Sequence, residues 1–294
     1  MGERLPDFLV IGAYKSGTTS LFRDLAGHPE IGVPEAKEVR SLVHDAVLSP
    51  EGRARYAAYF RAVADRPVVG EVAPQYTAEP YWRGVAERAA KLMGSELRVI
   101  YVVRHPIVRI ASHLAHRDRA APGPAEIDGA LPSGRFFEAD VSCYGYQVAP
   151  WLRHFPRRQI HIVPFERYAE APQTVCAEVF AFLGVDPGFA TGAGAHANAT
   201  AERPQKPRHV RRLLSARLYR LYVQPYVPRG LRSAVSRTLF PPARETASQP
   251  TLPPPSAQAL YAALAPDIAA FHRELELAQP LWPDLPPAVR PTGV

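Results

Sequence analysis

The sequence has little cysteine and no long hydrophobic run. Its two cysteines, Cys143 and Cys176, lie far apart and have no CxxC or Cys/His spacing, so nothing indicates a disulfide framework or a zinc site. The first apolar run, at residues 8–13, is too short for the core of a signal peptide. No run approaches the ~20 residues that a membrane-spanning helix needs. We therefore expect a soluble, cytoplasmic protein without a metal cofactor.

Lysine is also scarce, although the chain is basic. The 294 residues include 35 Lys plus Arg against 28 Asp plus Glu, which gives a formal net charge of +7. This excess suits an anionic ligand such as a nucleotide, a sulfated sugar, nucleic acid or a membrane surface, and does not choose among them. The four lysines are Lys15, Lys37, Lys91 and Lys206. Because arginine is the usual cation of this chain, a lysine inside a motif is informative.

Short β-rich apolar runs alternate with helix-like stretches along much of the chain. The runs lie at residues 7–13, 66–71, 96–104 and 158–165, and the helix-like stretches that follow them lie at residues 18–27, 79–93, 106–117 and 172–184. This alternation is typical of βαβ units, and it predicts an α/β fold with a central parallel sheet flanked by helices. The stretch from Val99 to Val103 is continuously apolar, which favours a central strand buried on both faces.

The domain organisation follows from length and composition. With 47% hydrophobic residues, the chain can bury one large core. We expect residues 1–284 to form a single domain and residues 285–294 to form a loose C-terminal tail. The part from Pro225 onward is rich in proline but contains one good helix, at residues 256–277, which we expect to wrap onto the main domain.

The first motif joins a predicted strand to a predicted helix through the sequence GAYKSGTTS. Gly12 and Gly17 have the spacing of the two P-loop glycines, but Thr18 stands where that motif requires lysine, and Lys15 lies inside the loop instead. Such a turn presents free backbone N–H groups and the positive end of the helix dipole, which together form an anion site. An ordinary βα turn with a surface lysine is the alternative. The helix start adds hydroxyl donors at Thr18, Thr19 and Ser20.

The second motif begins at the end of the strand predicted around residues 98–103. Arg104 ends this strand and Ser112 lies on the helix predicted to follow. An arginine at the carboxyl end of a parallel strand faces the crevice where such sheets bind ligands, and its planar fork suits a phosphate. An exposed arginine and a solvated serine are the alternative. A kinase or NTPase would need a Walker lysine and an acidic Mg²⁺ ligand at a strand end. Neither is in place in this sequence, so this class is the second choice.

Both motifs resemble elements of the PAPS-dependent sulfotransferases, in the branch related to bacterial carbohydrate and heparan sulfate enzymes. KSGTTSL after FLVIGA resembles the 5′-phosphosulfate loop, and Arg104 with Ser112 resembles the 3′-phosphate element. The resemblance implies a P-loop-like three-layer fold, PAPS as donor, PAP as product and no metal. Lys15 would contact the 5′-phosphate and stabilise the leaving oxygen. The other loop residues implied in nucleotide binding are Ser16, Gly17, Thr18, Thr19 and Ser20.

The same resemblance suggests where the acceptor is activated. PEAKEVR resembles the KEP[HK]FF segment, whose glutamate serves as general base, and this assigns the base to Glu38. VVGEVAPQYT resembles an element that lines the acceptor side of the cleft. There Glu71 is expected to orient Lys15, the acceptor or loop backbone, and it is the second candidate for the base. Histidine is the base in the cytosolic small-molecule enzymes, so His113 and His116 are a third possibility.

The predicted activity is transfer of a sulfuryl group to a hydroxyl or amine of a carbohydrate or natural-product acceptor. Lys206, Arg208 and Arg211 lie where relatives place a basic loop over the nucleotide, and they are further 3′-phosphate candidates. The basic segment at residues 206–222 also suits peripheral contact with an anionic membrane, or a binding protein that is not an enzyme. We expect no nucleic-acid partner. The sequence leaves the acceptor and the oligomeric state open.

Overall fold

The structure of the chain is a computed structural model that describes residues 3–127, 131–192 and 250–284. One five-stranded sheet has the strand order β2-β3-β1-β4-β5, and its neighbouring strands pair in parallel. This confirms the predicted α/β class with a central parallel sheet. The strands are β1 (Phe8–Gly12), β2 (Ile31–Gly32), β3 (Val68–Val72), β4 (Arg98–Val103) and β5 (Ile160–Pro164).

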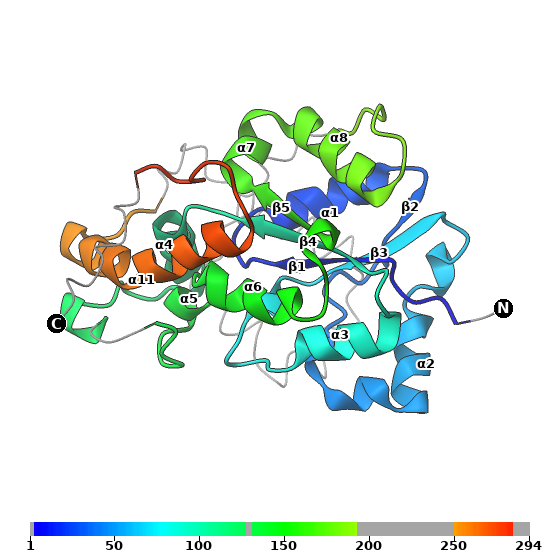
Figure 1. Cartoon of the computed structure of the whole chain (residues 1–294), viewed down its shortest axis with the longest axis horizontal. Helices are drawn as coiled ribbons and strands as arrows, with labels where there is room; N and C mark the ends of the chain where they lie inside the picture. Colours follow the sequence, from blue (N-terminus) through cyan, green and yellow to red (C-terminus); the bar gives the residue numbers. More distant parts are fainter. Residues whose placement is uncertain (1–2, 128–130, 193–249, 285–294) are drawn as a thin grey trace, which may run out of the picture. The chain divides into compact units, whose positions relative to one another are not determined.

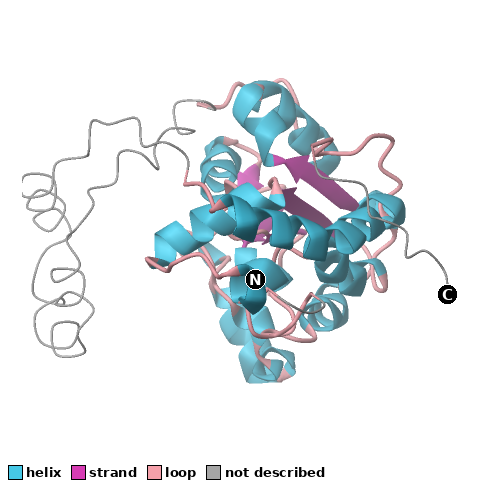
Figure 2. Ribbon diagram, turned by 90° about the vertical axis from the view of Figure 1, so that its left-hand side faces the viewer, coloured by secondary structure: helices cyan, strands magenta, loops and turns pink. Residues whose placement is uncertain are grey.

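Helices cover both faces of the sheet, as Figures 1 and 2 show. Because successive strand residues point to opposite faces, Val10 and Val102 pack in one core cluster while Leu9 and Val103 pack in the other. Helices α1 (Thr18–Gly27), α7 (Phe165–Glu170) and α8 (Pro172–Leu183) contribute to the first cluster. The second cluster includes residues of α2 (Pro50–Ala58), α3 (Val85–Met93), α4 (Pro106–Arg117), α5 (Phe137–Asp140), α6 (Tyr144–Leu152) and α11 (Pro254–Glu274).

The central strands are β1 and β4. All five residues of β1 are buried, and β4 is buried from Val99 to Val103, as expected for strands with helices on both sides. β4 lies between β1 and β5, so the prediction of a central strand at Val99–Val103 is confirmed. The three layers, with the sheet in the middle, also confirm the predicted three-layer arrangement.

The helix predicted after β3 begins later than the sequence pattern suggested. The helix-like stretch starts at Glu79, whereas α3 begins at Val85. Between β3 and α3 the chain forms the short 3₁₀ turn η4 (Pro74–Thr77), and Gly84 has the left-handed φ of 73° at the start of α3. Glycine adopts this conformation without strain, which explains why the helix starts there.

Helix α11 packs against α6 (Figure 1). The sequence predicted a helix at residues 256–277 on the main domain, and α11 covers residues 254–274. The Asp267 carboxylate of α11 accepts hydrogen bonds from the N–H groups of Gly145 and Tyr146, at 2.9 and 2.7 Å. These bonds satisfy free donors in the first turn of α6. Burial raises the pKa of Asp267 to about 6. The predicted boundaries at residues 284 and 285 stay a prediction, because residues 193–249 and 285–294 lie outside the described ranges.

Within the described ranges, no helix is both long and apolar enough to cross a membrane.

Candidate active site

The loop between β1 and α1 leads directly into the start of a helix through residues with a left-handed φ. Gly17 precedes α1 with a left-handed φ of 85°, and a Cβ added there would lie 2.5 Å from the Phe165 ring. Both the conformation and the close approach therefore require glycine. α1 begins at Thr18, and its first turn carries no acidic side chain. The N–H groups of Ser20 and Leu21 donate to the Gly17 carbonyl, at 2.9 and 3.2 Å, so an anion at this helix start would be met by the N–H groups that precede Ser20.

Arg104 lies directly beside this loop. Its guanidinium donates a hydrogen bond of 3.3 Å to the carbonyl of Lys15 and lies 4.6 Å from the centre of the Phe165 ring. The Tyr144 hydroxyl accepts from the Arg104 N–H at 3.2 Å and donates to the Arg104 carbonyl at 2.5 Å. Both backbone polar groups of Arg104, just after β4, are thus bonded to Tyr144. The structure thus brings the Arg104 guanidinium next to the backbone of Lys15.

Ser112, the partner predicted for Arg104, is half-buried on α4. The α4 helix begins at Pro106, directly after the Arg104–His105 segment. Ser16 in the first loop is fully buried, while Thr19 is exposed at the start of α1. The binding of nucleotide phosphates by these residues stays a prediction.

Arg109 is a residue of the site that sequence reasoning missed. It is fully buried on α4, and it donates to the Tyr14 carbonyl at 3.2 Å and to the Ser142 hydroxyl at 2.7 Å. It also donates to the carbonyl of Glu138. One guanidinium therefore fixes the residue before Lys15 to two other segments. The available signal was an arginine among apolar residues of α4, one turn before His113.

Glu38 lies in the segment after β2, beside the start of α1. Its carboxylate is 3.5 Å from the Lys37 ammonium and 3.2 Å from the Arg40 guanidinium. The Glu38 side chain is 27% exposed, so an acceptor can reach it. Lys37 in turn donates a hydrogen bond of 2.8 Å to the Thr19 hydroxyl. Lys37 therefore contacts both Glu38, the predicted base, and Thr19, a residue of the predicted phosphate site.

Glu71 occupies a different environment, at the buried end of β3. Its carboxylate has no exposed surface and accepts hydrogen bonds from the Tyr56 hydroxyl at 2.6 Å and the Tyr76 hydroxyl at 2.9 Å. It also accepts from the backbone N–H of Arg40 at 3.3 Å. Burial raises the pKa of Glu71 to about 7, although these hydrogen bonds oppose the shift. Among the roles expected for Glu71, the contact with Arg40 corresponds to orienting loop backbone.

Three rings pack together at Tyr14, the residue that precedes Lys15 in the loop. The Tyr14 ring stacks on the His113 ring with centroids 5.5 Å apart, and Phe137 meets both rings edge-on. Burial raises the pKa of Tyr14 to about 12, and the nearby negative charge of Glu38 adds to this. Tyr14 therefore lies near the predicted base.

The two histidine candidates for the base differ in exposure. Burial, together with the positive charges of Arg109, Arg117 and Lys15, lowers the pKa of His113 to about 3. A histidine with such a pKa is neutral at physiological pH and accepts a proton weakly. His116 is exposed near the end of α4.

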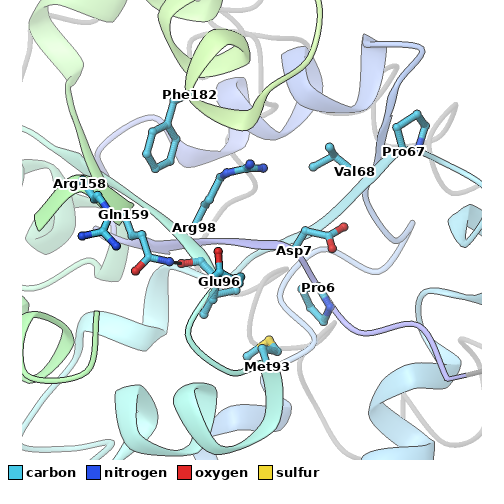
Figure 3. Close-up of a pocket in the computed structure, with 11 residues that line it drawn as sticks. Pro6, Asp7, Pro67, Val68, Met93, Glu96, Arg98, Arg158, Gln159 and Phe182 are labelled. Atoms are coloured by element: carbon cyan, nitrogen blue, oxygen red, sulfur yellow. Dashed lines mark hydrogen bonds between the residues drawn. The ribbon is translucent and has the colours of Figure 1, made fainter. Parts of the chain in front are cut away.

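A cavity of about 480 Å³ lies beyond the amino ends of the strands, whereas the candidate site lies at their carboxyl ends. Figure 3 shows Asp7 just before β1 and Arg98 at the start of β4 on its wall. Ligands of open parallel sheets bind beyond the carboxyl ends of the strands, and none of the predicted site residues lines this cavity. Its lining consists of Pro6, Asp7, Pro67, Val68, Met93, Glu96, Leu97, Arg98, Arg158, Gln159 and Phe182.

Two further predictions concern metals and the basic segment. Among the residues that the structure describes, no group of three or more His, Cys, Asp or Glu side chains could hold a metal ion. Lys206, Arg208, Arg211 and the rest of the segment at residues 206–222 lie outside the described residues.

The fold defines a class of protein: an α/β protein in which a P-loop-like turn joins a central strand to a helix at the carboxyl ends of a parallel sheet. Residues 5–192 match the family described as the sulfotransferase domain. Because this match spans more than half of the 294 residues, the chain belongs to the sulfotransferase family.

Several known proteins are similar to this chain. Heparan sulfate glucosamine 3-O-sulfotransferase 6 of Homo sapiens is 26% identical over 190 residues, which cover 62% of this chain and 53% of that protein. Heparan sulfate glucosamine 3-O-sulfotransferase 3B1 of Mus musculus is 24% identical over 191 residues, which cover 62% of this chain and 47% of that protein. The matches thus span about half the length of these relatives.

A solved structure supports the fold. The crystal structure of a sulfotransferase from Alicyclobacillus acidocaldarius aligns with a TM-score of 0.60 and 21% sequence identity. The alignment covers 95% of this chain and 99% of that one. At this identity, the likeness concerns the fold.

Proposed function

We propose that this protein transfers a sulfuryl group from PAPS to a hydroxyl or amine of a carbohydrate or natural-product acceptor and releases PAP. One observation carries the proposal: Arg104 donates to the carbonyl of Lys15, so a strand-end arginine and the loop lysine meet at the start of α1. This pair suits a ligand with two separate phosphates. The relatives named for heparan sulfate support the carbohydrate part of the proposal.

The donor is bound by the start of α1 and the loop before it. The 5′-phosphate accepts hydrogen bonds from the N–H groups of the first turn, where the helix dipole also favours an anion. Arg104 and Ser112 bind the 3′-phosphate. Lys15 lies at the bridging oxygen, where its charge stabilises the electron density that builds up as this oxygen leaves. The other residues assigned to the donor are Ser16, Gly17, Thr18, Thr19 and Ser20, with Lys206 and Arg208 as further candidates.

Glu38 accepts the proton of the acceptor. The acceptor oxygen or nitrogen attacks sulfur, and the bond between sulfur and the bridging oxygen breaks. The electron pair of that bond leaves with the 5′-phosphate of PAP, and the acceptor proton passes to the Glu38 carboxylate. Glu71 acts on this step indirectly, because its hydrogen bond to the Arg40 N–H positions the segment that carries Glu38.

Calorimetry with PAP and AMP in the presence of EDTA tests the proposed donor. We expect PAP to bind without metal and at least tenfold more tightly than AMP, since a charge-assisted phosphate contact contributes about 1.5–3 kcal/mol. Equal affinity for PAP and AMP would remove the 3′-phosphate site from the proposal. Tight binding of ATP that depends on Mg²⁺, with weak binding of PAP, would favour the alternative of a kinase or NTPase.

A further inference from the structure

Lys37 connects the predicted donor site with the predicted base. Its ammonium donates a hydrogen bond of 2.8 Å to the hydroxyl of Thr19, the second residue of α1. The same ammonium lies 3.5 Å from the Glu38 carboxylate. One flexible cation therefore spans the gap between the start of α1 and the group proposed to take the acceptor proton.

The backbone around Lys37 fixes where its side chain begins. The Lys37 N–H donates to the Glu35 carbonyl at 3.0 Å, and the Glu38 N–H donates to the Val72 carbonyl at 3.2 Å. The segment is thus tied to the end of β3, next to the phosphate loop. The Lys37 side chain is only 19% exposed, so its ammonium is directed to this place by the surrounding protein and is not an ordinary solvated charge.

The local charges favour an additional anion beside Lys37. The start of α1 carries the positive end of the helix dipole, and the first turn has no acidic side chain to balance it. Placing an ammonium at the same end is electrostatically unfavourable unless an anion joins it. Glu38 balances part of this charge, and Arg40 also contacts that carboxylate, at 3.2 Å.

Lys91 shows what an ordinary lysine of this chain looks like. It is 57% exposed on α3 and pairs with Glu87 one turn earlier, at 2.7 Å. Such an exposed pair contributes little to stability. Lys37 differs from Lys91 in burial, in its partners and in its position at the start of α1, and this makes Lys91 a matched control.

We propose that Lys37 contacts the sulfuryl group of bound PAPS. This inference rests on the proposed function. In an in-line transfer, the sulfuryl group lies between the leaving oxygen and the attacking atom. In this protein Lys15 is assigned to the leaving oxygen and Glu38 to the proton of the attacking atom, so the group in transfer lies between them. The Lys37 ammonium lies between Thr19 and Glu38, on the side of the site where the sulfuryl group is expected.

The contact gives Lys37 two roles in the reaction. It adds a positive charge beside the equatorial oxygens of the sulfuryl group, which need stabilisation during transfer. It also moves away from the Glu38 carboxylate when PAPS binds. Glu38 then keeps one of its two cationic partners, Arg40, and its carboxylate is free to accept a hydrogen bond from the acceptor.

Calorimetry with PAPS and with PAP, in the absence of acceptor, tests the contact through binding alone. For Lys37→Met we expect PAPS affinity to fall about 10- to 100-fold, the range of one charge-assisted hydrogen bond, and PAP affinity to fall less than threefold. Lys37→Arg should retain most of the PAPS affinity. Lys91→Met should bind both nucleotides like the unmodified protein, and thermal unfolding should show that each variant folds.

The outcomes separate this inference from the proposed function. If the unmodified protein binds neither PAPS nor PAP, the proposed donor is wrong. If it binds both, and Lys37→Met loses equal affinity for the two nucleotides, Lys37 contacts a phosphate or shapes the loop, and the contact with the sulfuryl group is refuted. An unchanged affinity for both nucleotides in Lys37→Met refutes it as well.

Discussion

The carboxylate of Glu71 and the backbone N–H of Arg40 are joined by a hydrogen bond of 3.3 Å. Arg40 follows Glu38 by two residues, and the Glu38 N–H is itself bonded to the Val72 carbonyl. The buried Glu71 carboxylate therefore holds the backbone of the segment that carries Glu38. We therefore propose different functions for Glu38 and Glu71, the two candidates for the base, and each function has its own test.

Glu38→Gln should reduce turnover about 10²–10⁴-fold, the contribution expected of a positioned general base. The amide preserves the size of the side chain but does not accept the acceptor proton. The fold and the affinity for PAP should remain almost unchanged. Turnover of PAPS with a responsive acceptor, measured beside PAP binding, gives both quantities. If Glu38→Gln stays active while Glu71→Gln is inactive in the folded state, the base is Glu71. Activity in both variants would make His113 and His116 the next residues to replace.

Glu71 should make the stability of the protein depend on pH. Its pKa is raised from 4.5 to about 7 in the folded state, so between these values the folded protein holds a proton that the unfolded chain has released. Stability therefore falls as pH rises from about 4.5 to about 7. A pKa unit corresponds to ~1.4 kcal/mol, which gives a loss of about 3 kcal/mol.

Thermal unfolding of Glu71→Gln over the same pH range isolates this contribution. The glutamine does not titrate, so the variant should show a flatter dependence of Tm on pH than the unmodified protein. Glu87→Gln is a suitable control, because Glu87 is exposed on α3. Parallel curves for the unmodified protein and Glu71→Gln would contradict the raised pKa.

The sequence was sufficient to predict the elements of this fold that depend on local pattern. The alternation of apolar runs and helical stretches predicted the parallel sheet, and the strand-loop-helix pattern around Lys15 predicted the turn that joins β1 to α1. The position of Arg104 near the first loop was predictable because the carboxyl ends of adjacent parallel strands lie side by side. The contact between Arg104 and the Lys15 carbonyl follows from the adjacency of β1 and β4.

The contacts that position the site could not be predicted, because they join residues far apart in the sequence. Arg109 reaches the Tyr14 carbonyl across 95 positions, and Lys37 reaches Thr19 across 18. The bond from the Tyr56 hydroxyl to Glu71 depends on how α2 packs under the sheet. Local periodicity predicts that such residues are buried or exposed, but it does not predict which partner each one meets.

Lys15→Ala should slow transfer far more than it weakens PAP binding. The charge of Lys15 matters most as the leaving oxygen becomes negative, whereas the N–H groups of the first turn still hold the phosphate. Single-turnover rates measured beside calorimetric affinities distinguish the two effects. A loss of affinity as large as the loss of rate would assign Lys15 to binding of the ground state.

Arg109→Met should destabilise the protein and loosen the phosphate loop. The substitution removes the three hydrogen bonds that Arg109 donates, to the Tyr14 carbonyl, the Ser142 hydroxyl and the Glu138 carbonyl. At about 1 kcal/mol for each lost hydrogen bond, the free energy of unfolding should fall by about 3 kcal/mol. Chemical denaturation measures this loss.

Arg109→Lys distinguishes loop positioning from stability. Lysine keeps the positive charge but not the planar fork, so it cannot reach all three acceptors at once. We expect a folded variant whose affinity for PAP is about tenfold lower, because the residue before Lys15 is no longer fixed. Arg53→Lys is the control, since Arg53 is 45% exposed and pairs with Glu3. If Arg109→Lys binds PAP as tightly as the control does, Arg109 contributes to stability alone and the Tyr14 carbonyl does not need it to hold the loop.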